Sequence, residues 1–372
     1  MPETDPPRDA AARRSPVPAL AAIALVVTAI ALAFAWTAGL LSPGKLTPDR
    51  MTDAIERGNG QVYPGYRRAH AKGICISGYF QGNGNGVALS EAPMFTTGPT
   101  PFVGRMSIGG GKPHGDDGSA RVRSMALGLV SGDGQEWRMA MNSFPFFAVS
   151  SVEAFHEQVI ASTPMPDTGK PDPERMKAFL ARHPEAARFA EWAKTAPWPT
   201  SFANTTYNGV NTFRFTNPDG VERHVRWSMQ PQTPLVAMTA EQREVASQDF
   251  LSKDLIDRLA QGPLLWDMLV TLAEPGDSIT DPAQEWPADR QQVNVGTVVI
   301  ESAQPQATGP CRDINFDPLL LPAGVDGSED PILAARSAVY SPSFNRRQRE
   351  IAHGRADDAT SAAPAAPQGS TP

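Results

Sequence analysis

One uncharged, apolar segment near the N-terminus determines how this chain of 372 residues must be divided. Residues 15–44 contain no ionisable side chain, and residues 19–41 are almost wholly apolar. About 20 such residues are enough for a helix to cross the hydrocarbon core of a bilayer. Because cytoplasmic flanks carry the excess of positive charge, we expect the N-terminus in the cytoplasm and the chain after Lys45 on the other side. The preceding positive charges are Arg8, Arg13 and Arg14.

Four parts follow from this division. We expect a cytoplasmic N-terminus over residues 1–16, a transmembrane helix over residues 17–41, a folded domain over residues 46–354 and a disordered tail over residues 355–372. A cleavable signal peptide stays open, since Ala33-Phe34-Ala35 has the form of a cleavage site, and so does a twin-arginine export signal. The expected location is the inner membrane with the folded domain in the periplasm, or the periplasm itself after cleavage.

Composition narrows the class of protein. Glycine and proline, with 31 and 36 residues, interrupt the chain too often for a coiled coil, a helical solenoid or a multi-span membrane protein. A net charge of −7 gives no support to nucleic-acid binding, which needs a basic face. Two cysteines exclude a disulfide scaffold and a zinc ribbon; Cys75 and Cys311 can either pair or stay free.

The periodicity of the folded part predicts an α+β chain built around an antiparallel sheet. Strand-like alternation comes first, then helical periodicity, then a strand and a last helix. Pro218 and Gly220 stand where a type I turn favours them, and Thr239 and Gln242 match a capping box. The predicted strands are residues 137–142, 212–215, 221–229 and 293–301, and the predicted helices follow Ser151, cover 173–194 with a break before Pro184, and cover 239–261.

Three common catalytic motifs are missing from the sequence. Gly111-Lys112 is followed by Pro113, so the glycines before it do not form a phosphate-binding loop. The six histidines show no paired metal-ligand spacing, and no G-x-S-x-G elbow occurs.

Two segments near opposite ends of the folded part carry candidate chemistry. Arg67 and His70 precede an apolar strand; being three residues apart, they face opposite ways on a regular strand, so reaching one site requires irregular backbone. Arg336 and Tyr340 share a helix face at i, i+4. A nearby guanidinium favours the phenolate form of tyrosine, which is a hard anionic ligand suited to ferric haem iron.

Several ordered blocks together resemble the catalase family of haem peroxidases. They are similar to the family's distal-histidine block, the following strand, the distal-asparagine block, the N-G-x-x-T-F region and the proximal block. The resemblance covers about 290 residues. The matching blocks are Arg67-x-x-His70-Ala71-Lys72-Gly73, Arg105-Met106-Ser107, Asn142-Ser143-Phe144-Pro145-Phe146-Phe147, Asn208-Gly209-Val210-Asn211-Thr212-Phe213, and Phe316-Asp317-Pro318 with Pro322, Gly324, Arg336, Tyr340 and Arg347.

The resemblance implies a catalase-like antiparallel β-barrel with surrounding helices, preceded by one transmembrane helix, and a role for each candidate residue. Tyr340 is the implied iron ligand and Arg336 its partner. His70 is the implied distal acid and base, Asn142 orients peroxide, and Ser107 holds the imidazole. The implied haem-contacting residues are Arg67, Arg105, Phe147, Arg336, Tyr340 and Arg347; the first two arginines and Arg347 pair with the propionates.

The implied activity is reduction of peroxides by haem b through a ferryl intermediate, with a small electron donor. The chain is short for a catalase, and Ala69 and Phe144 stand where catalases usually have valine and a small residue. We therefore expect organic hydroperoxides as substrates, besides hydrogen peroxide. A true catalase and a hydroperoxide isomerase of the allene-oxide type stay open, and a haem carrier has no need of a distal acid–base pair. NADPH is not expected, because the basic cluster expected at residues 197–204 is missing.

Overall fold

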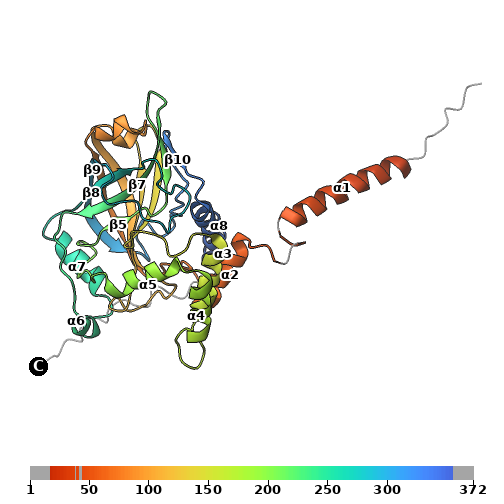
Figure 1. Cartoon of the computed structure of the whole chain (residues 1–372), viewed down its shortest axis with the longest axis horizontal. Helices are drawn as coiled ribbons and strands as arrows, with labels where there is room; N and C mark the ends of the chain where they lie inside the picture. Colours follow the sequence, from red (N-terminus) through yellow and green to blue (C-terminus); the bar gives the residue numbers. More distant parts are fainter. Residues whose placement is uncertain (1–16, 38, 42–43, 355–372) are drawn as a thin grey trace, which may run out of the picture. The chain divides into compact units, whose positions relative to one another are not determined.

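The structure, a computed structural model, describes residues 17–37, 39–41 and 44–354 (Figure 1). The chain divides into two compact units, the first ending at Thr47 and the second beginning at Pro48. The predicted cytoplasmic N-terminus over residues 1–16 and the predicted disordered tail over residues 355–372 lie outside the described residues.

In the first unit, helix α1 (Val17–Thr37) has 21 residues and no charged side chain. Among the described residues it is the one helix long and apolar enough to cross a membrane. A signal sequence meets the same criterion, so the helix is compatible with either an anchor or a signal.

A closed antiparallel barrel of eight strands forms the second unit. Its strands follow the order β7-β5-β4-β3-β2-β1-β9-β8, and β8 pairs again with β7. This closure confirms the predicted fold class and leaves no open sheet edge within the ring. The barrel strands are β1 (Gly73–Gly82), β2 (Gly98–Ile108), β3 (Arg123–Val130), β4 (Glu136–Asn142), β5 (Tyr207–Asn208), β7 (Glu222–Pro231), β8 (Leu264–Leu272) and β9 (Gln292–Pro305).

The predicted hairpin is confirmed. Strand β6 (Phe213–Thr216) pairs with β7, and β10 (Val325–Gly327) pairs with β6 on its other side. The side-chain oxygen of Asn217 accepts hydrogen bonds from the backbone N–H groups of Asp219 and Val221. Gly220, with φ at 76°, supplies the left-handed residue that closes this turn.

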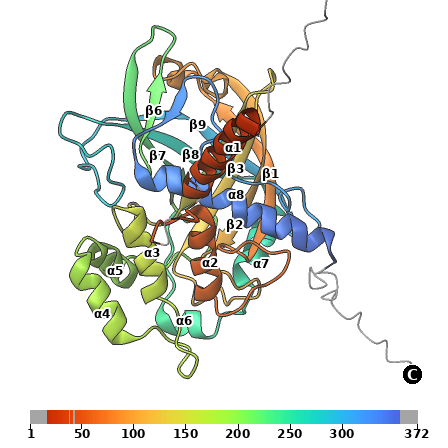
Figure 2. The same ribbon diagram turned by 90° about the vertical axis from the view of Figure 1, so that its right-hand side faces the viewer.

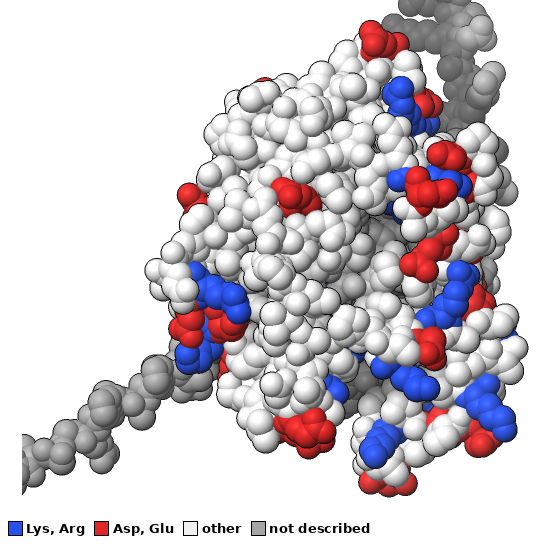
Figure 3. Space-filling view, turned by 60° about the vertical axis from the view of Figure 1, so that its left-hand side comes forward, with Lys and Arg blue, Asp and Glu red and all other residues white. Residues whose placement is uncertain are grey.

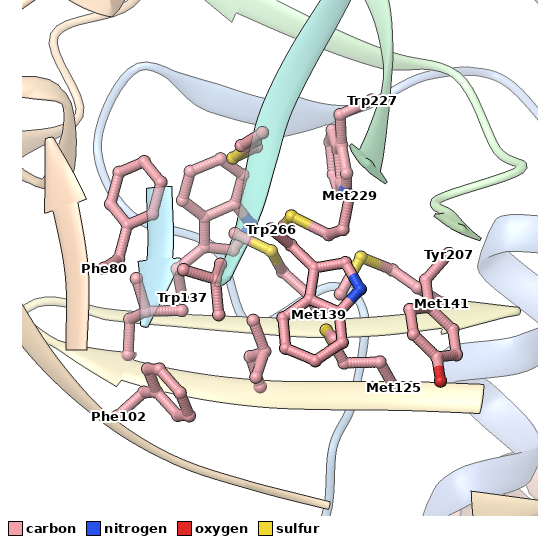
Figure 4. Close-up of a cluster of buried hydrophobic side chains, with 14 of the residues drawn as sticks. Phe80, Phe102, Met125, Trp137, Met139, Met141, Tyr207, Trp227, Met229 and Trp266 are labelled. Atoms are coloured by element: carbon pink, nitrogen blue, oxygen red, sulfur yellow. The ribbon is translucent and has the colours of Figure 1, made fainter. Parts of the chain in front are cut away.

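Large apolar side chains fill the barrel (Figure 4). Strand β4 shows the alternation: Trp137, Met139 and Met141 are buried in the interior cluster, while Arg138 and Ala140 are less buried. The rings of Trp137 and Trp227 meet edge to face with centroids 5.4 Å apart. Because side chains fill the interior, a ligand site must use the outer face of the strands.

Helices cover the barrel, and one of them is long. Helix α8 (Pro331–Ala352) is capped by Asp330, whose carboxylate accepts hydrogen bonds from the N–H groups of Ile332 and Leu333. It packs against α2 and α3, and Arg346 of α8 pairs with Asp49 and Asp53 of α2 (Figure 2). The other helices are α2 (Pro48–Gly58), η1 (Asn85–Ala88), η2 (Pro93–Phe95), α3 (Val152–Ala161), α4 (Pro173–Arg182), α5 (Ala186–Thr195), α6 (Ala240–Glu244) and α7 (Phe250–Leu259).

The prediction of one helix over residues 239–261 is wrong, since α6 and α7 are separate, although the capping box at Thr239 is present. Between them, the carbonyl of Gln248 accepts a hydrogen bond from Nζ of Lys72 at 2.7 Å. The same Nζ pairs with the carboxylate of Asp249 at 2.8 Å. These tertiary contacts satisfy a backbone carbonyl and a carboxylate between α6 and α7, and they outweigh the weak local preference for helix.

A disulfide joins Cys75 of β1 to Cys311, which lie 236 positions apart in sequence and have Cα atoms 5.3 Å apart. Both residues are buried. The bond ties the segment before α8 to the barrel, and Arg67 donates to the carbonyls of Cys311 and Ile314 in that segment. A disulfide typically stabilises a fold by about 2–4 kcal/mol, so the pair helps to hold Arg67 in place.

Both signs of charge are interspersed on the face shown in Figure 3, around a large uncharged area. Lysine and arginine side chains there lie beside aspartate and glutamate side chains. Fields of opposite sign cancel over such a face, so it carries no broad single-sign potential.

Candidate functional site

A cavity of about 390 Å³ lies between the outer face of the barrel and the helices, α8 among them. Strands β2, β3 and β4 contribute one part of its lining, helices α2, α3, α5 and α8 another, and the connecting loops the rest. The structure brings all nine residues named from the sequence to this one cavity. They are Arg67, His70, Arg105, Ser107, Asn142, Phe147, Arg336, Tyr340 and Arg347.

Irregular backbone brings both Arg67 and His70 to the cavity. They lie before β1 rather than in it, and His70 has a left-handed φ of 55°. A non-glycine residue in that region is uncommon and strained, which is frequent at functional sites. Strand β1 then starts at Gly73, where a Cβ atom would lie 2.4 Å from the carbonyl of Met106 and 2.5 Å from Nη2 of Arg105. Glycine is needed there because Arg105 passes directly over it.

Three polar residues that are paired across neighbouring strands form one row of the sheet beside His70. Register pairs Ser107 of β2 with Ser124 of β3, and Ser124 with Asn142 of β4. The hydroxyl of Ser124 donates to Oδ1 of Asn142 at 2.6 Å and lies 3.1 Å from Nδ1 of His70. The prediction that Ser107 holds the imidazole differs from this arrangement: Ser107 lines the cavity, but Ser124 makes the contact.

The environment of His70 keeps its ring neutral. Enclosure by protein, followed by the positive charges of Arg105 and Arg336, lowers the pKa of His70 from 6.5 to about 4. Two smaller effects oppose each other: a hydrogen bond to the backbone of Ile108 raises the pKa of His70, and the charge of Arg67 lowers it. At neutral pH the imidazole therefore has one free nitrogen lone pair and can accept a proton.

Helix α8 presents Arg336 and Tyr340 one turn apart, as predicted. The guanidinium of Arg336 donates to Oδ1 of Asn211 at 2.5 Å and to the carbonyl of Ala140 at 2.7 Å. Nδ2 of Asn211 in turn donates to the buried carboxylate of Asp330 at 2.6 Å. This chain of hydrogen bonds fixes the guanidinium of Arg336 one helical turn before Tyr340.

Three guanidinium groups concentrate positive charge at the cavity: Arg105 and Arg347 are buried, and Arg67 is partly buried. None of the three forms an ion pair with a carboxylate in the described part of the chain. Arg67 and Arg347 donate to backbone carbonyls, and Arg105 donates to Gln306. Burial, then the charge of Arg347, lowers the pKa of Arg105 to about 9, and burial lowers that of Arg347 to about 10. Nε of Arg347 is buried without a hydrogen-bond partner.

This charge imbalance tests whether the cavity suits haem. Buried cations are costly unless paired, and carboxylates satisfy arginine with the strongest hydrogen bonds. The two propionates of a haem would supply those carboxylates, while the apolar lining suits the porphyrin. Phe147 adds an aromatic surface, packing on Phe144 and Phe155 with centroids 6.3 and 5.3 Å away. The residues of the cavity therefore fit a haem.

Four residues at the site were missed in the sequence. Ser124 could have been found, because a hairpin centred on Asp133 pairs residue 124 with residue 142. Gln306 follows β9 directly and bonds both Arg105 and the carbonyl of Ala71, which no local pattern indicates. Met51 and Ile55 of α2 line the cavity although they precede every block of the resemblance.

Comparison with known proteins identifies the family of this chain. The sequence profile of the catalase family matches residues 46–351. A catalase-related peroxidase from Synechococcus elongatus is 39% identical over 330 residues, covering 89% of this chain and 96% of that protein. A second one, from Mycolicibacterium paratuberculosis, is 34% identical over 305 residues, covering 82% and 96%. A fungal catalase structure, 21% identical, superposes with a TM-score of 0.69 over 80% of this chain and 62% of its own.

These matches define the class of protein as an oxidoreductase acting on peroxide, in a family whose members bind haem. The chain belongs to the catalase family, and its match to two catalase-related peroxidases over nearly their full length makes it a catalase-family peroxidase.

Proposed function

We propose that this chain is a haem b peroxidase that reduces organic hydroperoxides, and hydrogen peroxide besides, at the expense of a small electron donor. The observation that carries the proposal is one cavity holding a neutral histidine, hydrogen-bonded through Ser124 to Asn142, together with Tyr340 on α8. A base, a hydrogen-bond donor and an anionic iron ligand are the groups that heterolysis of a peroxide bond requires.

Tyr340 would hold the iron, and Arg67, Arg105 and Arg347 would hold the propionates. When bound, the haem supplies the two electrons that break the O–O bond. His70 would accept the hydroperoxide proton at its free nitrogen and return it to the departing oxygen that carries R, so that the RO fragment leaves as the alcohol ROH. Two further electrons and two protons come from the donor, and the second oxygen leaves as water. Asn142, with its Oδ1 bound to Ser124, has its amide N–H groups to orient the peroxide.

The apolar walls of the cavity support organic peroxides as substrates. Met51 and Ile55 of α2, Phe155 of α3 and Phe189 of α5 all belong to the lining. Their side chains can pack against the alkyl group of a hydroperoxide. The two relatives that match over 96% of their length are named catalase-related peroxidases rather than catalases, which favours peroxidase over catalase activity for this chain.

Paired assays of the purified full chain with haem test the substrate class. We expect tert-butyl hydroperoxide to drive oxidation of a donor dye well above the background of His70→Ala, with little O₂ release from hydrogen peroxide. Rapid O₂ release without dye oxidation would instead identify a true catalase. Conversion of a fatty-acid hydroperoxide without any donor would identify an isomerase, and haem binding without turnover would identify a carrier.

We also propose that α1 anchors the protein and that the haem domain lies outside the cytoplasm. The disulfide between Cys75 and Cys311 supports this location, because such bonds persist in oxidising compartments. In cells lysed in denaturant in the presence of a thiol-alkylating reagent, which exposes the buried residues, both cysteines should stay unlabelled until a reductant is added. Labelling of both cysteines without reductant would place the domain in the cytoplasm.

A further inference from the structure

Ser124 lies between Ser107 and Asn142 in one row of the sheet, and its side chain contacts both His70 and Asn142. Its Oγ lies 3.1 Å from Nδ1 of His70 and 2.6 Å from Oδ1 of Asn142, and the residue is 7% exposed. Ser107 belongs to the same row but lies one strand further from Asn142. Among the described residues, a side chain that joins the two groups is found only at position 124.

Counting hydrogens in this network decides the form of the histidine. The amide oxygen of Asn142 carries no hydrogen, so the single hydroxyl hydrogen of Ser124 goes to it. Toward His70 the serine oxygen can then only accept, and the hydrogen of that bond must be on Nδ1. A neutral imidazole has one N–H group, so Nε2 keeps its lone pair.

We propose that Ser124 is a positioning residue: it fixes His70 as the Nδ1–H tautomer and locks the amide of Asn142 with its N–H groups available to peroxide. This inference rests on the proposed function. With the other tautomer the free lone pair would lie on Nδ1, beside Ser124, and Nε2 could not take up the proton of a hydroperoxide. A turned amide would in the same way present an oxygen, which repels the peroxide oxygens.

Histidine tautomers are read directly from side-chain nitrogen shifts in ¹⁵N–¹H NMR of the full chain prepared without haem. The chain has six histidines, and loss of one signal set in His70→Gln assigns His70. We expect a single Nδ1–H form in the unsubstituted protein and a mixture of both tautomers in Ser124→Ala. If Ser124→Ala keeps the single form, the backbone hydrogen bond at Ile108 is sufficient and the proposal is overturned.

Kinetics of the haem-loaded protein give the second readout. Loss of an outer partner that orients a functional side chain costs about 10- to 100-fold, so Ser124→Ala should slow the second-order reaction with hydroperoxide by that factor. The KM for the electron donor should not change. Ser124→Thr, which keeps the hydroxyl, should recover most of the rate and the single tautomer. Equal rates in Ser124→Ala and the unsubstituted protein would overturn the proposal.

Two further serine variants separate the possible causes. Ser131→Ala, in the turn after β3, is the matched control and should leave rate and tautomer as they are. Ser107→Ala tests the competing position; a larger loss there than in Ser124→Ala would assign the imidazole contact to Ser107 and overturn the proposal. The NMR result needs neither haem nor turnover, so failure of the proposed peroxidase activity and failure of the Ser124 assignment give different outcomes.

Discussion

His70→Ala is expected to slow the reaction with hydroperoxide by about 10²- to 10⁴-fold, the usual contribution of a positioned acid–base group. The side chain is neutral, lines the cavity and is held through Nδ1, so its removal leaves no other described cavity residue able to move the peroxide proton. Haem content should not change, because His70 is not among the residues proposed to hold the haem. Stopped-flow mixing with tert-butyl hydroperoxide measures the loss.

The pH profile of the same reaction is the sharper measurement. A base must be unprotonated, so the rate should be constant above the pKa of His70 and fall about tenfold per unit below it. The residue's pKa of about 4 places the fall in acid. Propionates paired with Arg105 would remove part of the repulsion and move the fall upward, but burial and Arg336 hold it below 6.5. A fall centred above 6.5 would contradict the role of His70.

A matched histidine variant controls for nonspecific effects. His114 is exposed and is not part of the cavity lining, so His114→Ala should keep both the rate and the pH profile. Equal losses in the two variants would show that the effect of His70→Ala comes from a damaged fold rather than from a missing base.

That nine residues would meet in one cavity could be predicted because each stands in a short block whose order along the chain is informative. His70 and Tyr340 lie 270 positions apart in sequence numbering, yet both line one cavity. The hydrogen-bond partner of His70 could not be predicted in the same way. Ser107 and Ser124 occupy neighbouring positions in one row, and the contact of the imidazole with Ser124 rather than Ser107 depends on where the ring lies, which no local sequence pattern indicates.

Tertiary contacts account for the other differences between sequence and structure. Local periodicity favours one helix over residues 239–261, but Lys72, more than 170 positions earlier, bonds the backbone at Gln248. The pairing of Cys75 with Cys311 depends on how the segment before α8 returns to β1, which composition does not report. Strand alternation, by contrast, was enough to predict β4 and the hairpin of β6 and β7.

Tyr340→Phe is expected to have the largest effect on the cofactor itself, since it removes one oxygen and nothing else. Losing an outer partner of a metal ligand already costs 10- to 100-fold in affinity, so losing the ligand should weaken haem binding by at least about 100-fold. Of the other cavity-lining residues that could bind iron, Met125 and Met141 belong to the barrel interior, and the free Nε2 of His70 is assigned to transfer of the hydroperoxide proton. Tyr340 is therefore the one described residue on α8 suited to ferric iron.

Haem titration and the ferric absorption spectrum measure this loss, and two companion variants interpret it. Tyr79→Phe removes a hydroxyl from β1 outside the cavity lining and should bind haem normally with an unaltered spectrum. Tyr340→His offers an imidazole in place of the phenolate, so it should recover binding while giving a different ferric spectrum. An unaltered spectrum in Tyr340→Phe would rule out Tyr340 as the ligand, and with it the assignment of α8 as the side of the cavity that holds the iron.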